Sequence, residues 1–102
     1  MPEKIKREAM ITVIIPALNE AETIGTVIGL VRSSPLVSEI IVMDDKSNDN
    51  TIKVAREAGA SVYTSTMLGK GASMREGILF AKNELLLFLD VGGSMDPFVR
   101  TC

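Results

Sequence analysis

The chain of 102 residues contains no histidine, and this absence excludes several classes of chemistry at once. Ser-His and Cys-His nucleophilic systems, acid–base catalysis by imidazole and histidine metal sites all need the missing side chain. The lone cysteine is the final residue, Cys102, so the sequence offers no internal disulfide and no cysteine cluster. A metal ion would therefore be held by carboxylates, and the cysteine usage favours a reducing, cytoplasmic compartment.

Charge of one sign and long apolar runs are also scarce. Eleven basic against thirteen acidic side chains give a net charge of −2, without the basic excess that nucleic-acid binding usually needs. Apolar runs such as Leu85 to Leu89 are far shorter than the ~20 residues of a spanning helix. The charged N-terminus, MPEKIKREAM, is unlike a signal peptide. We therefore expect neither a nucleic-acid partner nor a membrane span.

What remains is the composition of one folded unit. With 46% hydrophobic residues the chain can bury a core, and its length allows a single domain. Residues 1–10 are polar and of mixed charge, which is typical of an arm that precedes a fold. The domain is accordingly predicted to span residues 11–102.

Strand-like and helix-like segments alternate along this domain. Apolar, β-branched runs predict four strands, with Pro16 ending the first: Ile11–Ile15, Glu39–Met43, Ser61–Ser65 and Leu85–Leu89. Helical periodicity and capping residues predict three helices: one capped by Asn19 and Glu22 and running through Val31, one over Thr51–Ala58 before Gly59, and one from Gly69 to about Asn83. This order favours an α/β fold in three layers, with a mainly parallel four-stranded sheet and helices on both faces.

Most of the unusual polar chemistry lies where the predicted strands end. The segments are PALNE at 16–20, DDKSND at 44–49, LGKG at 68–71 and DVGGSMD at 90–96. In open α/β sheets, ligands bind outside the carboxyl ends of the strands. The sequence therefore predicts a binding site at that edge of the sheet.

Three acidic or basic features at this edge suit a nucleotide. Asp44 and Asp45 repel each other, and such a carboxylate can accept from a base N–H or a ribose hydroxyl, although capping around Ser47 is the structural alternative. Lys70 lies between glycines, where its ammonium could reach a diphosphate or be an exposed loop lysine; the spacing is neither G-x-x-x-x-G-K-[ST] nor G-x-G-x-x-G. Asp90 directly follows an apolar strand, which favours a metal or sugar-hydroxyl role.

Four segments in this order resemble the family 2 glycosyltransferases of the GT-A fold, over about Ile11 to Asp90. They are VIIPALNEAETIGTVI, IIVMDDKSNDNT, GKGASMREGI and LLLFLD, which begin at residues 13, 40, 69 and 85. Within the family, the PALNEAETIG and GKG segments are most similar to glucosyl-3-phosphoglycerate synthases, followed by dolichyl-phosphate mannose synthase-like enzymes.

The resemblance implies that the chain binds a nucleotide-diphosphate sugar, whose sugar passes to an acceptor hydroxyl. Ala17, Leu18 and Glu20 would line the nucleoside, Asp45 would contact the base, and Lys70 would lie near the base or phosphates. Asp90 would begin a metal-binding D-x-D and hold Mg²⁺ or Mn²⁺, although Gly92 stands where the second acid is expected. The positions assigned to donor and metal are thus Pro16, Ala17, Leu18, Glu20, Asp44, Asp45, Lys70 and Asp90.

The resemblance also implies an incomplete enzyme. The chain ends where the acceptor half of the family would begin, so catalysis by it alone is not expected, and uncovered surface favours a homo-oligomer. A rival interpretation is a non-catalytic binding or assembly module: LLLFLDVGGSMD resembles the start of a von Willebrand factor A-type domain, with a divalent ion at Asp90 and Ser94. A transferase-like fold with no function of its own is the third hypothesis.

Overall fold

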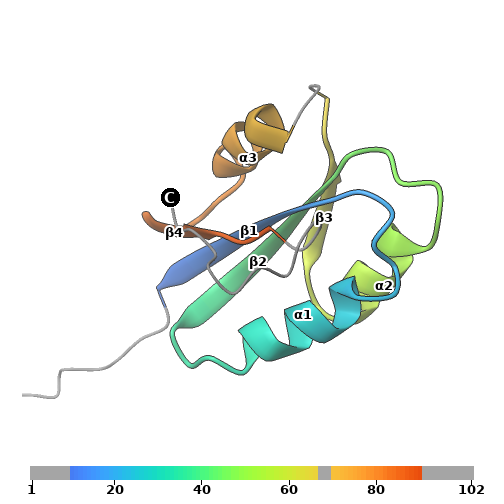
Figure 1. The fold of residues 1–102 in the computed structure, drawn as a ribbon. Coiled ribbons are helices and arrows are strands. Elements are labelled where there is room, and N and C mark those ends of the chain that lie inside the picture. The colour runs from blue at the N-terminus through green and yellow to red at the C-terminus, as the bar shows by residue number, and fades with distance from the viewer. Residues whose placement is uncertain (1–9, 67–69, 91–102) are drawn as a thin grey trace, which may run out of the picture.

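The computed structural model describes residues 10–66 and 70–90, in which strands and helices alternate as predicted (Figure 1). The elements are β1 (Ile11–Ala17), α1 (Ile24–Arg32), β2 (Val37–Asp44), α2 (Thr51–Glu57), β3 (Ser61–Thr64), α3 (Lys70–Ile78) and β4 (Leu85–Phe88). Within these ranges no helix has the length and apolar character needed to cross a membrane.

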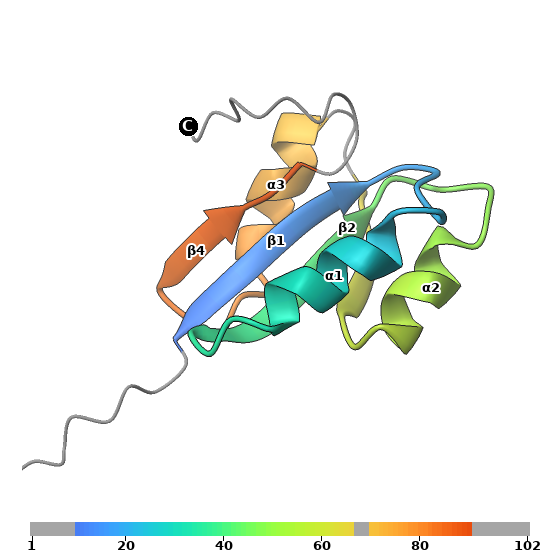
Figure 2. The ribbon, with the colours of Figure 1, turned by 60° about the horizontal axis from the view of Figure 1, so that its bottom comes forward.

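All four strands are parallel, in the order β3-β2-β1-β4. Helices α1 and α2 cover one face of the sheet and α3 covers the other (Figures 1 and 2). Right-handed crossovers explain this division: the chain moves from β1 to β3 in one direction, then returns past β2 and β1 to reach β4. The predicted three-layer α/β fold is confirmed.

The first strand is longer than predicted, because Pro16 lies inside it and pairs with Met43 of β2. The Leu89 N–H donates to the Ile14 carbonyl at 3.0 Å, so the hydrogen-bonding groups of Ile14 face β4. Two residues on, Pro16 faces the same side, where the pairing with β4 has ended at Ile14 and Phe88. The missing proline N–H therefore costs no ladder hydrogen bond, and the prediction that Pro16 ends the strand was wrong.

Two helix boundaries also differ from the prediction. Helix α1 begins at Ile24 with Thr23 at its N-cap, whereas Asn19 lies earlier, in a left-handed turn with φ 53°. Helix α3 ends at Ile78 rather than near Asn83. The N–H groups of the next three residues donate to carbonyls three positions back, which tightens the chain into turns.

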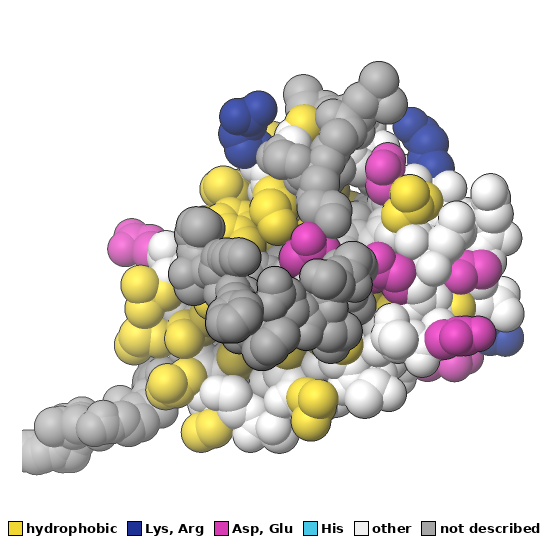
Figure 3. Space-filling model, in the orientation of Figure 1, with side chains coloured by type: hydrophobic (Ala, Val, Ile, Leu, Met, Phe, Trp, Pro, Cys, Tyr) yellow, Lys and Arg dark blue, Asp and Glu magenta, His cyan; other side chains and the backbone are white. Residues whose placement is uncertain are grey.

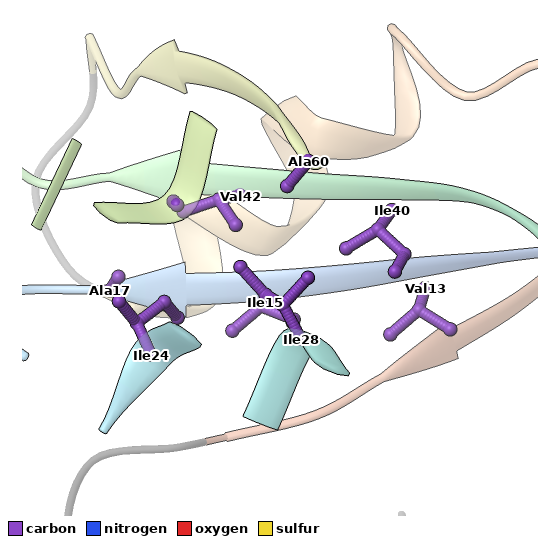
Figure 4. Close-up of a cluster of buried hydrophobic side chains, with 9 residues drawn as sticks. Val13, Ile15, Ala17, Ile24, Ile28, Ile40, Val42 and Ala60 are labelled. Carbon is purple, nitrogen blue, oxygen red and sulfur yellow. The ribbon is translucent and has the colours of Figure 1, made fainter. Parts of the chain in front are cut away.

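The core has two parts, one on each face of the sheet. The larger part lies between the sheet and the helices α1 and α2 (Figure 4), and its buried members are Val13, Ile15, Ala17, Ile24, Ile28, Ile40, Val42, Ala55 and Ala60. The smaller part lies on the α3 face and contains Ile14, Ile41 and Met43, with Tyr63, Ala81 and Leu86 packed against them. Neighbouring residues of β1 and β2 thus face opposite cores, which explains why the central runs of both strands, Val13 to Ile15 and Ile40 to Met43, are apolar on successive residues.

The apolar run of β4 is much less buried than the runs of β1 and β2. Leu85, Leu87 and Phe88 are 53%, 51% and 40% exposed. In the part of the chain that the structure describes, β4 is an edge strand bonded to β1 alone, and Figure 3 shows hydrophobic side chains gathered on this side of the molecule. This surface is compatible with self-association, which stays a prediction.

A glycine sets the distance between α3 and the sheet. A Cβ atom at Gly77 would lie 2.8 Å from Cγ2 of Ile14 and 3.1 Å from Cγ of Met43. The first separation is shorter than real Cβ contacts allow, and Ile14 is fully buried in the central strand. Only a residue without a Cβ fits this contact unless the helix moves outward.

We expect Gly77→Ala to lower the free energy of unfolding by about 1–3 kcal/mol, because the added methyl group overpacks the smaller core. Urea unfolding followed by circular dichroism measures this change. Gly29→Ala is the matched control, since a Cβ atom at Gly29 of α1 has no neighbour within 4 Å. Its helical backbone should gain about 0.5–1 kcal/mol, and a Gly77 variant as stable as the Gly29 variant would contradict the close contact.

Candidate functional site

The loops that follow β1 and β2 are joined into one unit at the carboxyl edge of the sheet. The register of the strands places Ala17 level with Asp44, so the two loops start side by side. Five hydrogen bonds connect them: Asp45 N–H to Ala17 O at 2.8 Å, Asn19 N–H to Ser47 Oγ at 2.8 Å, Asn48 N–H to Asn19 Oδ1 at 2.6 Å, Glu20 N–H to Thr51 Oγ1 at 2.8 Å, and Ala21 N–H to Asp49 Oδ2 at 3.2 Å.

The two adjacent acids at the end of β2 have different environments. Asp44 is fully buried and accepts hydrogen bonds from Ser47, from Oγ at 2.5 Å and from N–H at 2.9 Å. Asp45 is half-buried, and its carboxylate accepts no hydrogen bond from residues that the structure describes. Capping, the structural alternative for the pair, is therefore what Asp44 does. The carboxylate of Asp45 is available for a ligand.

The connection from β3 to α3 begins with a clamp formed by Glu76. Its carboxylate accepts hydrogen bonds from Thr66 Oγ1 at 2.7 Å, Thr66 N–H at 3.0 Å and Ser65 Oγ at 3.2 Å. The Thr66 hydrogen bonds, with a smaller contribution from the charge of Lys46, lower the pKa of Glu76. Lys70 is the first residue of α3, and the nucleotide-binding role of its side chain stays a prediction.

Asp90 is exposed and follows β4 at the same edge of the sheet. Together with Leu89 it borders a mostly apolar groove of about 360 Å³ along α1 and the turn that precedes it. The other residues that line the groove are Glu22, Thr23, Thr26, Val27 and Leu30. Asp90 and Asp45 therefore lie on opposite sides of β1, at the ends of its two neighbouring strands.

The other predicted site residues differ in what they can offer to a ligand. Pro16 and Ala17 are buried within β1, so they shape the edge rather than present side chains. Leu18 is 48% exposed directly beyond them, and Glu20 is half-buried. The structure thus places the predicted residues along one edge of the sheet, with Leu18 and Asp45 as the accessible side chains at its centre.

Asp90 is the residue that the sequence predicts to hold a metal ion, and this role stays a prediction. Residues 10–66 and 70–90 contain no group of three or more Cys, Asp or Glu residues that could hold a metal ion. One exposed carboxylate is nevertheless the kind of protein donor that Mg²⁺ uses when phosphate oxygens and waters complete its shell. Gly92 and Ser94 lie outside the described residues.

Sequence reasoning missed the residues that hold the loops together. Asn19 was expected to cap a helix, and Ser47 was considered only as a capping partner, yet together they connect the two loops. The spacing of Asp44 and Ser47, three residues apart, was the available signal for the turn between them.

A comparison with known families decides the identity of the fold. Residues 12–97 match the family described as Glycosyl transferase family 2. The chain belongs to this family. The match includes every position assigned to donor or metal, from Pro16 to Asp90.

Curated relatives within the family are considerably longer than this chain. A 4,4'-diaponeurosporenoate glycosyltransferase of Staphylococcus haemolyticus is 37% identical over 87 residues, which are 78% of this chain and 23% of that protein. A glucosyl-3-phosphoglycerate synthase of Petrotoga mobilis is 33% identical over 100 residues, covering 85% of this chain and 31% of the synthase. The chain therefore spans about a quarter to a third of these two relatives.

Solved structures of the family share the fold. The glucosyl-3-phosphoglycerate synthase of Mycobacterium tuberculosis, in complex with Mn²⁺, UDP and glucosyl-3-phosphoglycerate, is 32% identical, with a TM-score of 0.71 over 80% of this chain and 33% of its own. The mannosyl-3-phosphoglycerate synthase of Rubrobacter xylanophilus is 29% identical, with a TM-score of 0.74 over 87% of this chain and 33% of its own. The four-stranded parallel sheet thus has a GT-A-like fold.

The hydrogen-bonded carboxylates predict how stability depends on pH. The hydrogen bond from the Thr51 hydroxyl is the main cause that lowers the pKa of Asp49 from its ordinary 3.8. The hydrogen bonds from Thr66 lower the pKa of Glu76 from its ordinary 4.5. The unfolded chain protonates first as the pH falls, so both groups stabilise the fold above pH 4.5 and lose this effect as the pH drops through their lowered pKa values.

We expect the free energy of unfolding, measured in urea between about pH 3 and pH 6, to fall toward acid, and to fall less steeply in Glu76→Gln. Glu57→Gln is the control, because Glu57 is exposed at the end of α2 and makes no hydrogen bond to the described residues. Equal slopes for the wild type and Glu76→Gln would argue against the Glu76 clamp.

The different environments of the adjacent acids predict opposite results of alanine substitution. Asp44→Ala should lower the free energy of unfolding by about 1–3 kcal/mol, because it leaves the Ser47 donors without their acceptor. Asp45→Ala should change it by less than about 0.5 kcal/mol. Thermal and urea unfolding of the two variants, side by side, test this; equal destabilisation would mean that Asp45 is also structural.

Proposed function

We propose that this chain is the donor-binding part of a family 2 glycosyltransferase and binds a nucleotide-diphosphate sugar at the carboxyl edge of β1, β2 and β4. The observation that carries the proposal is the joined pair of loops. In it Ser47 occupies the Asp44 carboxylate, while the Asp45 carboxylate accepts no hydrogen bond from the described residues and lies at the same edge of the sheet as exposed Leu18. The similarity to a synthase whose structures contain UDP, UDP-glucose and Mn²⁺ supports it.

The nucleoside is the part of the donor that the described residues suit best. The carboxylate of Asp45 can accept a hydrogen bond from a base N–H, and Leu18 offers an apolar side chain against which the base or ribose can pack. Both project from backbone that the strand pairing and the five loop hydrogen bonds hold in place. A preformed edge of this kind lowers the entropy cost of binding.

The diphosphate and its metal ion would fall to the flanking residues. Lys70 would lie near the base or the phosphates, and Asp90 would supply one carboxylate to Mg²⁺ or Mn²⁺. Such an ion offsets the charge that develops on a diphosphate leaving group. Transfer of the sugar to an acceptor hydroxyl would need further residues, because the chain spans only about a third of its synthase relatives.

The ion-binding module at Asp90 and Ser94 has less support. Residues 12–97 match the glycosyltransferase family throughout, including the segment on which that interpretation depends. No observation on the described residues favours it over the donor site.

We expect the chain to bind UDP or GDP in the presence of Mn²⁺, measured by isothermal titration calorimetry. Asp45→Ala should weaken binding about tenfold, because a hydrogen bond to a charged acceptor is lost, while circular dichroism stays unchanged. Glu57→Ala removes an equal charge from an exposed position at the far end of α2 and should bind like the wild type. The absence of binding to both nucleotides would refute the proposal.

A further inference from the structure

The hydroxyl group of Ser47 lies between a buried charge and the neighbouring loop. It donates to Asp44 Oδ1 at 2.5 Å and accepts from the Asn19 N–H at 2.8 Å. Asp44 is fully buried at the end of β2. The Ser47 hydroxyl therefore links the β1–α1 loop to a carboxylate that is fixed at the end of β2.

The side chain of Asn19 makes a second hydrogen bond between the two loops. Its side-chain Oδ1 accepts from the Asn48 N–H at 2.6 Å, one residue beyond Ser47. Its backbone has a positive φ of 53°, a conformation that asparagine tolerates better than most residues do. Lys46, next to Ser47, also has a positive φ, 60°. Each loop thus contains one positive-φ residue, and the hydrogen bonds of Asn19 to Ser47 and Asn48 join the two loops next to these positions.

The accessible side chains of the proposed site stand next to these connecting residues. Leu18 directly precedes Asn19, and Asp45 directly follows Asp44. A shift of Asn19 relative to Ser47 would therefore change the separation of Leu18 and Asp45, although neither connecting residue needs to touch a ligand. Binding depends steeply on such placement, because a misplaced acceptor leaves a buried ligand N–H without its hydrogen bond.

We propose that Ser47 and Asn19 are positioning residues, which fix Leu18 and Asp45 at the separation that a nucleoside requires. This inference rests on the proposed donor-binding function and deepens it. The buried carboxylate of Asp44 holds the Ser47 hydroxyl, and this hydroxyl holds the Asn19 N–H in the loop that bears Leu18.

The test is a double-mutant cycle between Ser47 and Asp45, read out as the dissociation constant of UDP or GDP with Mn²⁺. Ser47→Ala keeps its N–H bond to Asp44 but loses both hydroxyl bonds, and it should weaken binding about tenfold. Ser47→Thr retains a hydroxyl and should restore most of the affinity. In an Asp45→Ala background, Ser47→Ala should have little further effect, because the separation of Leu18 and Asp45 affects binding only while the Asp45 carboxylate is present.

Controls separate positioning from loss of structure. Ser33→Ala removes a serine hydrogen bond to the Leu30 carbonyl at the far end of α1, and its affinity should equal that of the wild type. Asn19→Gly keeps the left-handed backbone accessible but removes the acceptor for Asn48, so it should weaken binding even where Ser47→Ala folds poorly. Thermal unfolding of each variant shows that the titrated protein is folded.

Two outcomes would overturn the inference. Wild-type affinity in folded Ser47→Ala and Asn19→Gly would show that the connection does not govern the site, with the donor-binding proposal intact. An equal loss from Ser47→Ala with and without Asp45 would show that it acts independently of that carboxylate. A wild-type chain that binds neither nucleotide would overturn both proposals together.

Discussion

The pairing of β1 with β2 in the middle of the sheet is the constraint on which the remaining structure depends. Its register places Ala17 level with Asp44, so both strands end at the same level of the sheet. The loops are then close enough for Asn19 to meet Ser47, and the polar side chains gather at one edge. A displacement by one residue would also turn each apolar set toward the wrong face.

Much of the fold could be predicted because local pattern and tertiary position agree. The runs around Ile14 and Ile41 are apolar on successive residues, as strands with a core on both sides require. The predicted boundaries were wrong where residues distant in sequence determine the local structure. Pro16 is tolerated because β4 has ended beside it, and Asn19 serves a neighbouring loop rather than its own helix. Neither fact can be predicted from the neighbouring residues in the sequence.

The candidate site was predictable as an edge but not as an arrangement. Chain order alone brings the loops of parallel strands together, which is why the residues from Pro16 to Asp90 could be assigned to one side of the sheet. The local pattern does not distinguish Asp44 from Asp45, since the two acids are identical and adjacent, and only the family resemblance assigned the base contact to Asp45. Burial distinguishes them: one carboxylate is enclosed and shared with Ser47, and the other is accessible.

The strand order has a consequence for how firmly the parts of the proposed site are held. Strand β4 joins β1 through a four-residue ladder at the edge, although the two segments are more than seventy positions apart in the chain. A four-residue ladder whose apolar side chains are half exposed has few buried contacts to stabilise it. Local opening should therefore release Asp90 first and leave the loops around Asn19 and Ser47 in place. The part of the proposed site that would bind the nucleoside would then stay ordered, while the part that carries Asp90, the proposed metal ligand, would open and close.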